Sequence, residues 1–333
     1  MGTKIRNNTI DLFRLYISFL VVYAHCGCSF SSVYRYAIPL LFTISGYFFC
    51  NIANEKKIAR IKKTFFLCLS TNIAYAVFYF VLAISEGQVS TWISSTFSVR
   101  SLVELVVFNK SPFAIHLWFL WALLYCMIID YFVSKHISSK KIYVGIIIAL
   151  IAVDAVYILF FRDHSKLLTR NFLFFGLPYF YIGKIFIDVD ISKIKINNIG
   201  ILSLFAVFIF TIFLEQKRMI ALGETGELEL YLSTPFLVIL VFIFALKNPL
   251  EKLNKPLSTL AMCGRSYCLS IYIVHYAIIS IVLKILGYNE FISTYPFLCA
   301  IFIFAIALLS SILYYSVKRA VVSRMKLKKS KNN

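Results

Sequence analysis

The first apolar stretch of the chain, residues 10–30, reads IDLFRLYISFLVVYAHCGCSF and follows two basic residues, Lys4 and Arg6. A secretory signal peptide also begins with basic residues and an apolar run, so that alternative has to be weighed. Asp11 and Arg14 interrupt this run, and no convincing small-residue cleavage site follows it. The stretch is therefore predicted to remain in the protein as its first membrane helix.

Nine further segments resemble the first in being apolar and long enough, or nearly so, to cross a bilayer at about 20 residues per helix. The ten segments lie at 10–30, 36–52, 64–84, 115–134, 142–161, 171–187, 199–214, 230–246, 266–286 and 295–317. The chain has 333 residues, of which 60% are hydrophobic, and a mean hydropathy of +0.83, which excludes an ordinary soluble domain. We therefore predict an all-α polytopic membrane bundle of about ten transmembrane helices.

The distribution of basic residues predicts how this bundle is oriented. With the N-terminus inside, 22 Lys and Arg residues fall in cytoplasmic segments and 8 in outer connections, so both termini are expected to be cytoplasmic. Residues 1–317 form one membrane domain, and residues 318–333 form a basic cytoplasmic tail drawn to anionic membrane lipid. We expect a multi-pass protein of the cell (plasma or inner) membrane.

The net charge of +19 raises the question of a nucleic-acid partner. The basic residues lie in the breaks between apolar runs and do not alternate with aromatic residues on a soluble face, so no nucleic acid is expected. The eight cysteines show no paired C-x-x-C spacing and the chain has no H-E-x-x-H motif, so no metal is expected either.

The longest connection, residues 85–114, contains the sequences WISSTF and SLVELVVF. These are amphipathic enough to lie along the outer interface of the membrane rather than to loop freely. In that position the connection could cover a pocket.

Three ionisable side chains in the first helix are the best pointers to function. Inserting a charge at the centre of a membrane helix costs about 3 kcal/mol of free energy even on lenient scales, so such residues are rarely kept without a role. Arg14 and His25 are eleven residues apart, which at about 100° per residue places them on one face, roughly 16 Å apart along the axis. Asp11 precedes Arg14 by three residues, close enough for an ion pair. The alternative is a purely structural Asp–Arg pair near the inner interface and a histidine reaching the outer one.

Four motifs carry a resemblance that covers nearly the whole chain. They are IDLFRLYISFLVVYAHC from residue 10, FTISGY at 42–47, HLWFL at 116–120 and GRSYCLSIYIVH at 264–275. In this order they resemble the D-x-x-R…H, F-x-x-S-G-F/Y, H-x-W-F/Y-L and G-x-x-S-x-x-x-Y-x-x-H patterns of the bacterial integral-membrane acyltransferase 3 family, known for O-acetylation of surface and wall polysaccharides.

The resemblance implies a membrane O-acyltransferase that moves acetyl from cytoplasmic acetyl-CoA to a glycan or lipid-linked saccharide. It implies that His25 is the catalytic histidine and Arg14 its essential partner, and that Ser45 and Gly46 shape the adjacent turn, where Ser45 helps to bind substrate. The family's basic R-x-R element is only approximated here, by Arg60 and Lys62.

General chemistry agrees with these roles. An imidazole with a pKa near 6.5 can take a proton from an acceptor hydroxyl at neutral pH. An arginine cannot act as a base, but it can bind phosphate or stabilise developing negative charge. Arg60, Lys62 and Lys184 are candidates for the phosphates of the donor.

Three further residues are candidates whose alternative role is structural. Asp154 is expected near the depth of His25 and could orient its imidazole, or it could pair with another buried polar group. His116 and Trp118 could hold an acceptor sugar, or they could belong to an interfacial aromatic belt. His275 is expected to make a structural hydrogen bond, and His136 and His164 are expected to be inert loop residues.

Two other functions stay open at this point. A small-solute transporter or export permease would also have about ten helices with intramembrane charges, but its paired broken helices are not visible in the sequence. A non-catalytic, ligand-binding member of the same family is the other alternative.

Overall fold

The structure is a computed structural model that describes residues 6–27, 34–160, 170–221, 223, 229–286 and 294–331. Within these ranges every regular element is helical and no residue forms a strand. Each of the ten apolar segments contains a helix, and the predicted all-α membrane bundle is confirmed. The chain divides into two compact units, which are described separately.

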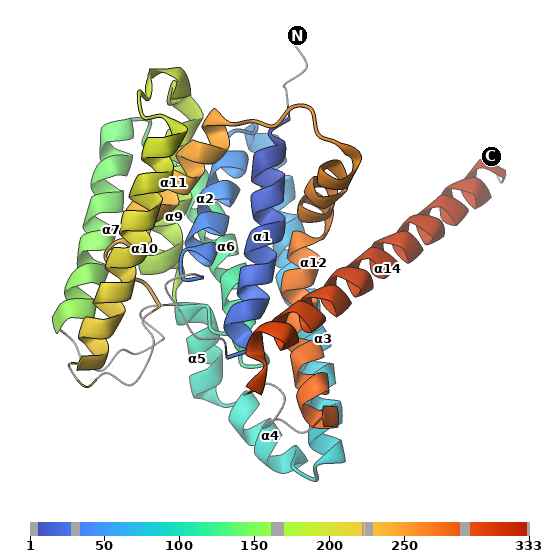
Figure 1. The fold of residues 1–333 in the computed structure, drawn as a ribbon. Helices are drawn as coiled ribbons and strands as arrows, with labels where there is room; N and C mark the ends of the chain where they lie inside the picture. The colour runs from blue at the N-terminus through green and yellow to red at the C-terminus, as the bar shows by residue number, and fades with distance from the viewer. Residues whose placement is uncertain are drawn as a thin grey trace. The chain divides into compact units, whose positions relative to one another are not determined.

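The first unit comprises Met1–Ser29 and Leu250–Asn333. It contains α1 (Asn8–His25), α12 (Lys255–Leu286) and α14 (Pro296–Lys331), which pack against one another (Figure 1). Val22 of α1, Ile271 of α12 and Ile303 of α14 are fully buried in their shared core. The side chain of Asn7 accepts a hydrogen bond from the Ile10 N–H and so caps α1.

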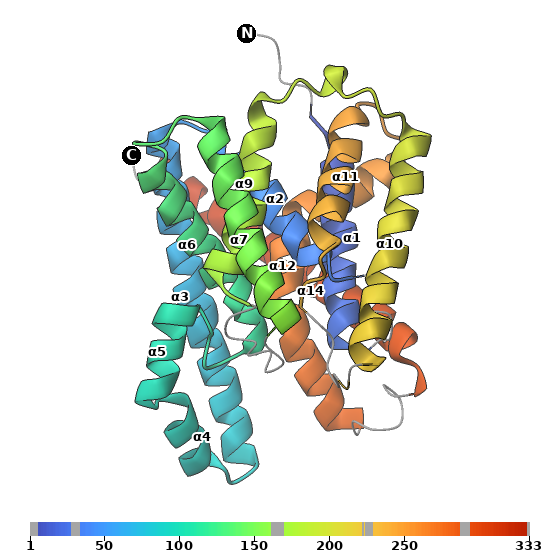
Figure 2. The same cartoon turned by 90° about the vertical axis from the view of Figure 1, so that its left-hand side faces the viewer.

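The second unit comprises Phe30–Pro249. Its elements are α2 (Ala37–Cys50), α3 (Asn54–Ser85), α4 (Val89–Thr96), α5 (Val99–Phe108), the 3₁₀ turn η2 (Ile115–Leu117), α6 (Trp118–Val133), α7 (Lys140–Phe160), the π-helical turn η3 (Phe172–Gly176), α9 (Leu177–Ile185), the 3₁₀ turns η4 (Phe186–Asp188) and η5 (Ile191–Lys193), α10 (Asn198–Ala221) and α11 (Thr234–Lys247). Figure 2 shows α4 beside the last turns of α3.

Large apolar side chains cover the outward faces of several helices. Five helices in the described ranges are long and apolar enough to cross a membrane: α3, η2 with α6, α10, α12 and α14. Phe66, Val77 and Val81 of α3 are 64%, 58% and 57% exposed. Such continuous apolar exposure is rare on soluble monomers, and lipid would cover it here.

Several helices extend beyond the apolar segments that predict them. The basic stretch 51–63, expected as a connection, instead contains the first turns of α3, and α12 begins at Lys255 rather than near 266. The basic tail continues α14 as far as Lys331. Hydrophobicity marks only the part of a helix that lipid covers, because hydrated basic turns lengthen a helix without adding apolar residues.

The connection 85–114 forms the two short helices α4 and α5. Val99, Val103 and Val106 of α5 are exposed, whereas Glu104 is buried, which agrees with the amphipathic character expected of this segment. Its position at the outer interface stays a prediction.

A close crossing of α2 and α9 explains the glycine of the FTISGY motif. A Cβ atom on Gly46 would collide with the carbonyl oxygen of Phe180, and one on Gly183 would collide with that of Thr43. The expectation that Ser45 and Gly46 shape a turn was therefore wrong, because both lie inside α2. Gly46 is required there because the two helix backbones touch.

We expect Gly46→Ala to destabilise the protein by about 1 to 3 kcal/mol, since the added methyl group meets backbone that cannot move aside. Gly145→Ala in α7 is the matched control, because nothing lies within 4 Å of its new Cβ. Replacing that glycine should stabilise the helix by about 0.5 to 1 kcal/mol. Thermal unfolding of the two purified variants in detergent measures the difference, and equal melting temperatures would contradict the close crossing.

Candidate active site

Two histidines meet where α1 ends. The His25 ring lies 5.2 Å from the His275 ring of α12 and 5.4 Å from the Tyr276 ring, measured between centroids. The two helices approach closely because Gly264 of α12 has no side chain: a Cβ there would collide with the carbonyl oxygen of Asp11. The motif at 264–275 thus contains both the glycine that lets α12 approach α1 and the histidine that contacts His25.

His275 is fully buried, and its Nδ1 lies 3.2 Å from the carbonyl oxygen of Ile271. The expected structural hydrogen bond is confirmed. Because a carbonyl oxygen only accepts, Nδ1 of His275 carries the proton, and Nε2 of the neutral ring is then an acceptor. Sequence reasoning did not pair His275 with His25, which is half-buried and 250 residues away in the chain.

An ion cluster lies at the other end of α1. Asp11, which is 3% exposed, accepts hydrogen bonds from Arg6 Nη2 at 2.6 Å and from Arg14 Nη1 at 3.2 Å. The predicted pair between Asp11 and Arg14 is confirmed, and Arg6 is a further member that the sequence did not single out. Two guanidinium groups on one carboxylate leave one net positive charge, and the Arg14 side chain is 24% exposed.

The second unit contains a buried lysine–aspartate cluster. Asp130 of α6, fully buried, accepts from Lys57 at 3.1 Å and from Lys184 at 2.5 Å. Lys184 also donates to the Tyr143 hydroxyl at 2.8 Å. The ammonium group of Lys184, a candidate for donor phosphate, is therefore already engaged by protein groups. Lys57 and Asp130 were not predicted, since nothing in their local sequence marks a pair 73 residues apart.

The remaining sequence candidates lie in the second unit in different environments. Arg60 and Lys62 are exposed on the early turns of α3. His116 is 2% exposed with its ring 4.9 Å from that of Tyr75, and Trp118 is 8% exposed. Neither of these two side chains offers surface to an acceptor sugar in this structure.

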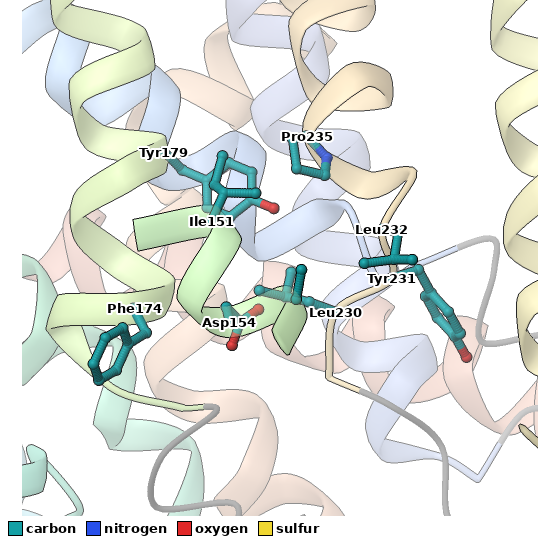
Figure 3. A pocket seen from close by; sticks show the side chains of 9 residues that line it. Ile151, Asp154, Phe174, Tyr179, Leu230, Tyr231, Leu232 and Pro235 are labelled. Atoms are coloured by element: carbon teal, nitrogen blue, oxygen red, sulfur yellow. The ribbon is translucent and has the colours of Figure 1, made fainter. Parts of the chain in front are cut away.

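Asp154 lines a narrow pocket near the end of α7 (Figure 3). Tyr179, Leu230 and Phe174 are among its other walls, and its volume of about 10 Å³ is at the lower limit for holding one water molecule. A sugar does not fit there. Asp154 belongs to the second unit and His25 to the first, and the proposed orientation of His25 by Asp154 stays a prediction. His164 lies outside the described residues, and His136 lies exposed between α6 and α7.

Comparison with known proteins identifies the family of the chain. The sequence model of a family described as an acyltransferase domain matches residues 7–315, which include all four motifs. Searches of curated proteins and of solved structures returned no match. Because the family match covers nearly the entire chain, this protein belongs to the acyltransferase 3 family of membrane acyltransferases.

Proposed function

We propose that the protein is an O-acetyltransferase of the cell membrane, which moves acetyl from cytoplasmic acetyl-CoA to a hydroxyl of a surface, capsule or wall glycan or of its lipid-linked precursor. The observation that carries this proposal is the placement of His25 beside His275 at one end of α1, with the Arg14 cluster at the other end. A base and an anion-binding group are the two parts that transfer from an acyl thioester requires.

His25 is the general base in this proposal. Its imidazole takes the proton of the acceptor hydroxyl while the hydroxyl oxygen forms a bond to the thioester carbonyl carbon. The carbon–sulfur bond then breaks, the electron pair stays on sulfur, and the imidazolium returns the proton to the leaving thiolate. The products are an acetyl ester and a free thiol, and His25 is neutral again.

His275 is the positioning residue for His25. Its Nε2 is an acceptor, so it can receive the N–H of His25 and leave the other nitrogen of that ring facing the substrate. The third member of a catalytic triad serves the same purpose, since it fixes the tautomer and the orientation of the catalytic imidazole. Burial of His275 keeps its ring in place.

Arg14 supports the donor side. Its guanidinium group belongs to a cluster with net positive charge and keeps part of its surface accessible, so it can bind an oxygen of a donor phosphate. Arg60 and Lys62 are exposed on a turn that the charge distribution predicts to be cytoplasmic, and we propose that they bind further donor phosphates.

We expect Arg14→Ala to raise the KM for acetyl-CoA, or to lower kcat, by about 10- to 100-fold while the KM for the acceptor changes less than about twofold. Steady-state transfer of labelled acetyl by the purified protein measures both constants. Arg6→Ala is the matched control, because Arg6 also pairs with Asp11 but is not proposed to meet the donor. Equal effects of the two variants would show that only the ion cluster matters and that Arg14 has no role in donor binding.

A further inference from the structure

A pocket of about 290 Å³ lies between α4, α5 and the segment that leads into η2. Ser95 of α4, Ser101 and Glu104 of α5, and Lys110, Ser111 and Phe113 of the following segment are among its walls. The volume is at the lower end of the range for ligand sites and matches one or two sugar rings. All of these residues belong to the second unit and to the connection that is predicted to face outward.

Serine hydroxyls are present on three sides of this α4–α5 pocket, and each of the three donates a hydrogen bond to the protein. Ser101 donates to the carbonyl oxygen of Ser95 at 2.8 Å, and Ser111 donates to the side-chain oxygen of Asn72 at 2.6 Å. Ser111 Oγ also accepts the N–H groups of Phe113 and Ala114, at 3.2 and 3.4 Å, so its lone pairs are already engaged. The Ser95 and Ser101 hydroxyls donate to the protein and keep a lone pair for a donor from a ligand. Ser95 on α4 and Ser101 on α5 thus offer oriented acceptors to a molecule that carries many hydroxyl groups.

The two charged residues among the pocket walls, Glu104 and Lys110, compensate each other. Glu104 accepts from Lys110 at 2.6 Å and from Arg100 at 2.9 Å. The hydrogen bond from Lys110 holds the pKa of the Glu104 carboxyl below its usual range, so the carboxylate is ionised at neutral pH. Because Glu104 already engages Lys110, the pocket is better suited to a hydroxyl-rich ring than to a phosphate.

One wall of the pocket is aromatic. Phe113 lines it, and the ring of Phe97 lies 5.9 Å from that of Phe113. Sugar rings have polar edges and an apolar C–H face, so a site with serine hydroxyls on some sides and a phenyl ring on another matches both surfaces. The exposed valines of α5 lie on the same helix as Ser101 and Glu104, where the lipid part of a membrane-anchored saccharide would run.

We propose that the α4–α5 pocket binds a saccharide ring of the acyl acceptor. This inference rests on the proposed function, because it names where the acceptor of that transfer is held. The saccharide reaches the pocket either as a soluble glycan chain or as the head of a lipid-linked precursor, and both present the same ring chemistry. His116 and Trp118, expected from the sequence to hold the sugar, follow the pocket segment in the chain but are buried.

Ser94 and Ser95 provide a matched pair for the test. Both are exposed serines of α4, and each donates to a backbone carbonyl three residues earlier, at 3.0 and 3.1 Å respectively. Ser95 lines the pocket, whereas Ser94 is not one of its walls. We expect Ser95→Trp to fill the pocket and raise the KM for the acceptor about tenfold or more, and Ser94→Trp to change it less than about twofold.

A binding measurement tests whether the pocket holds a saccharide independently of whether the protein transfers acetyl groups. Full-length Ser95→Cys and Ser94→Cys proteins in nanodiscs are labelled with a membrane-impermeant maleimide, and the labelling of the unchanged chain is subtracted. One arm adds soluble glucose, galacturonate and N-acetylglucosamine oligosaccharides; the other places a polyprenyl-diphosphate-linked saccharide in the disc. We expect the saccharide to slow maleimide labelling of the cysteine at position 95 and not of the one at position 94. The saccharide that slows labelling, soluble or lipid-linked, identifies the form of the acceptor.

Protection at 95 without any transfer of label by the unchanged protein would support the pocket and overturn the proposed function. If the unchanged protein transfers label and Ser95→Trp and Ser94→Trp change the KM for the acceptor equally, the proposed role of the pocket is overturned. The proposed function then stands. Absence of protection in both arms would also overturn the pocket.

Discussion

Replacing His25 with alanine is expected to reduce acetyl transfer about 10²- to 10⁴-fold, the usual contribution of a positioned general base. The His25 ring is half-buried beside His275 and Tyr276, so it is held in place while part of its surface stays accessible. Transfer of labelled acetyl from acetyl-CoA to a glycan acceptor by the purified variant measures the loss. Membrane insertion and yield should not change.

The control for this experiment is His136→Ala, which removes an exposed loop histidine. Retention of more than about a tenth of the normal rate by His25→Ala would exclude the base role. His275→Gln gives a second comparison. If His275 positions His25, this variant should shift the acidic limb of the kcat/KM profile against pH as well as lower the rate, whereas a merely structural role would lower the rate alone.

Replacing Asp130 with alanine is expected to destabilise the second unit by about 3 to 5 kcal/mol, because it leaves two ammonium groups without their carboxylate. The side chains of Lys57 and Lys184 are 6% and 16% exposed, so water compensates little of the lost interaction. Thermal unfolding in detergent should show a large drop in melting temperature. A double variant, Asp130→Ala with Lys57→Met, should recover part of it, since one buried charge is removed.

Asp188→Ala is the matched control for Asp130→Ala. Asp188 pairs with Lys140 at 3.3 Å, but the side chains are 62% and 50% exposed, and such surface pairs contribute about 0 to 1 kcal/mol. If the two aspartate variants unfold at the same temperature, burial of the lysine–aspartate cluster has no energetic consequence and this account of it is wrong.

The sequence predicts those parts of the molecule that depend on local spacing. The ten apolar segments correspond to helices because crossing a bilayer requires a minimum length of apolar residues. The pair between Asp11 and Arg14 follows from their three-residue separation on one helix. The fold class and the pairing of Asp11 with Arg14 were therefore accessible without a structure.

Contacts between distant segments were not accessible in this way. Lys57 and Asp130 meet only because α3 and α6 pack together, and His275 reaches His25 only because Gly264 lets α12 approach α1. Gly46 gave a different error, since the resemblance implied a turn at Ser45 and Gly46, whereas the structure has a close helix crossing there. Neither hydropathy nor motif spacing encodes which helices are neighbours.

Transfer across the membrane is the central claim, and sealed vesicles of opposite orientation test it most directly. Labelled acetyl-CoA is added outside inside-out vesicles, which expose the cytoplasmic face, and outside right-side-out vesicles. The glycan acceptor is placed at the outer face of the membrane in both, which is the lumen of the inside-out vesicles and the outside of the right-side-out vesicles. We expect acetylated glycan only in the inside-out vesicles, because the donor is proposed to bind near Arg14 on the cytoplasmic side and the acceptor to react near His25 on the outer side. Equal transfer in the right-side-out vesicles would contradict this path and would place donor and acceptor at a single outward-facing site.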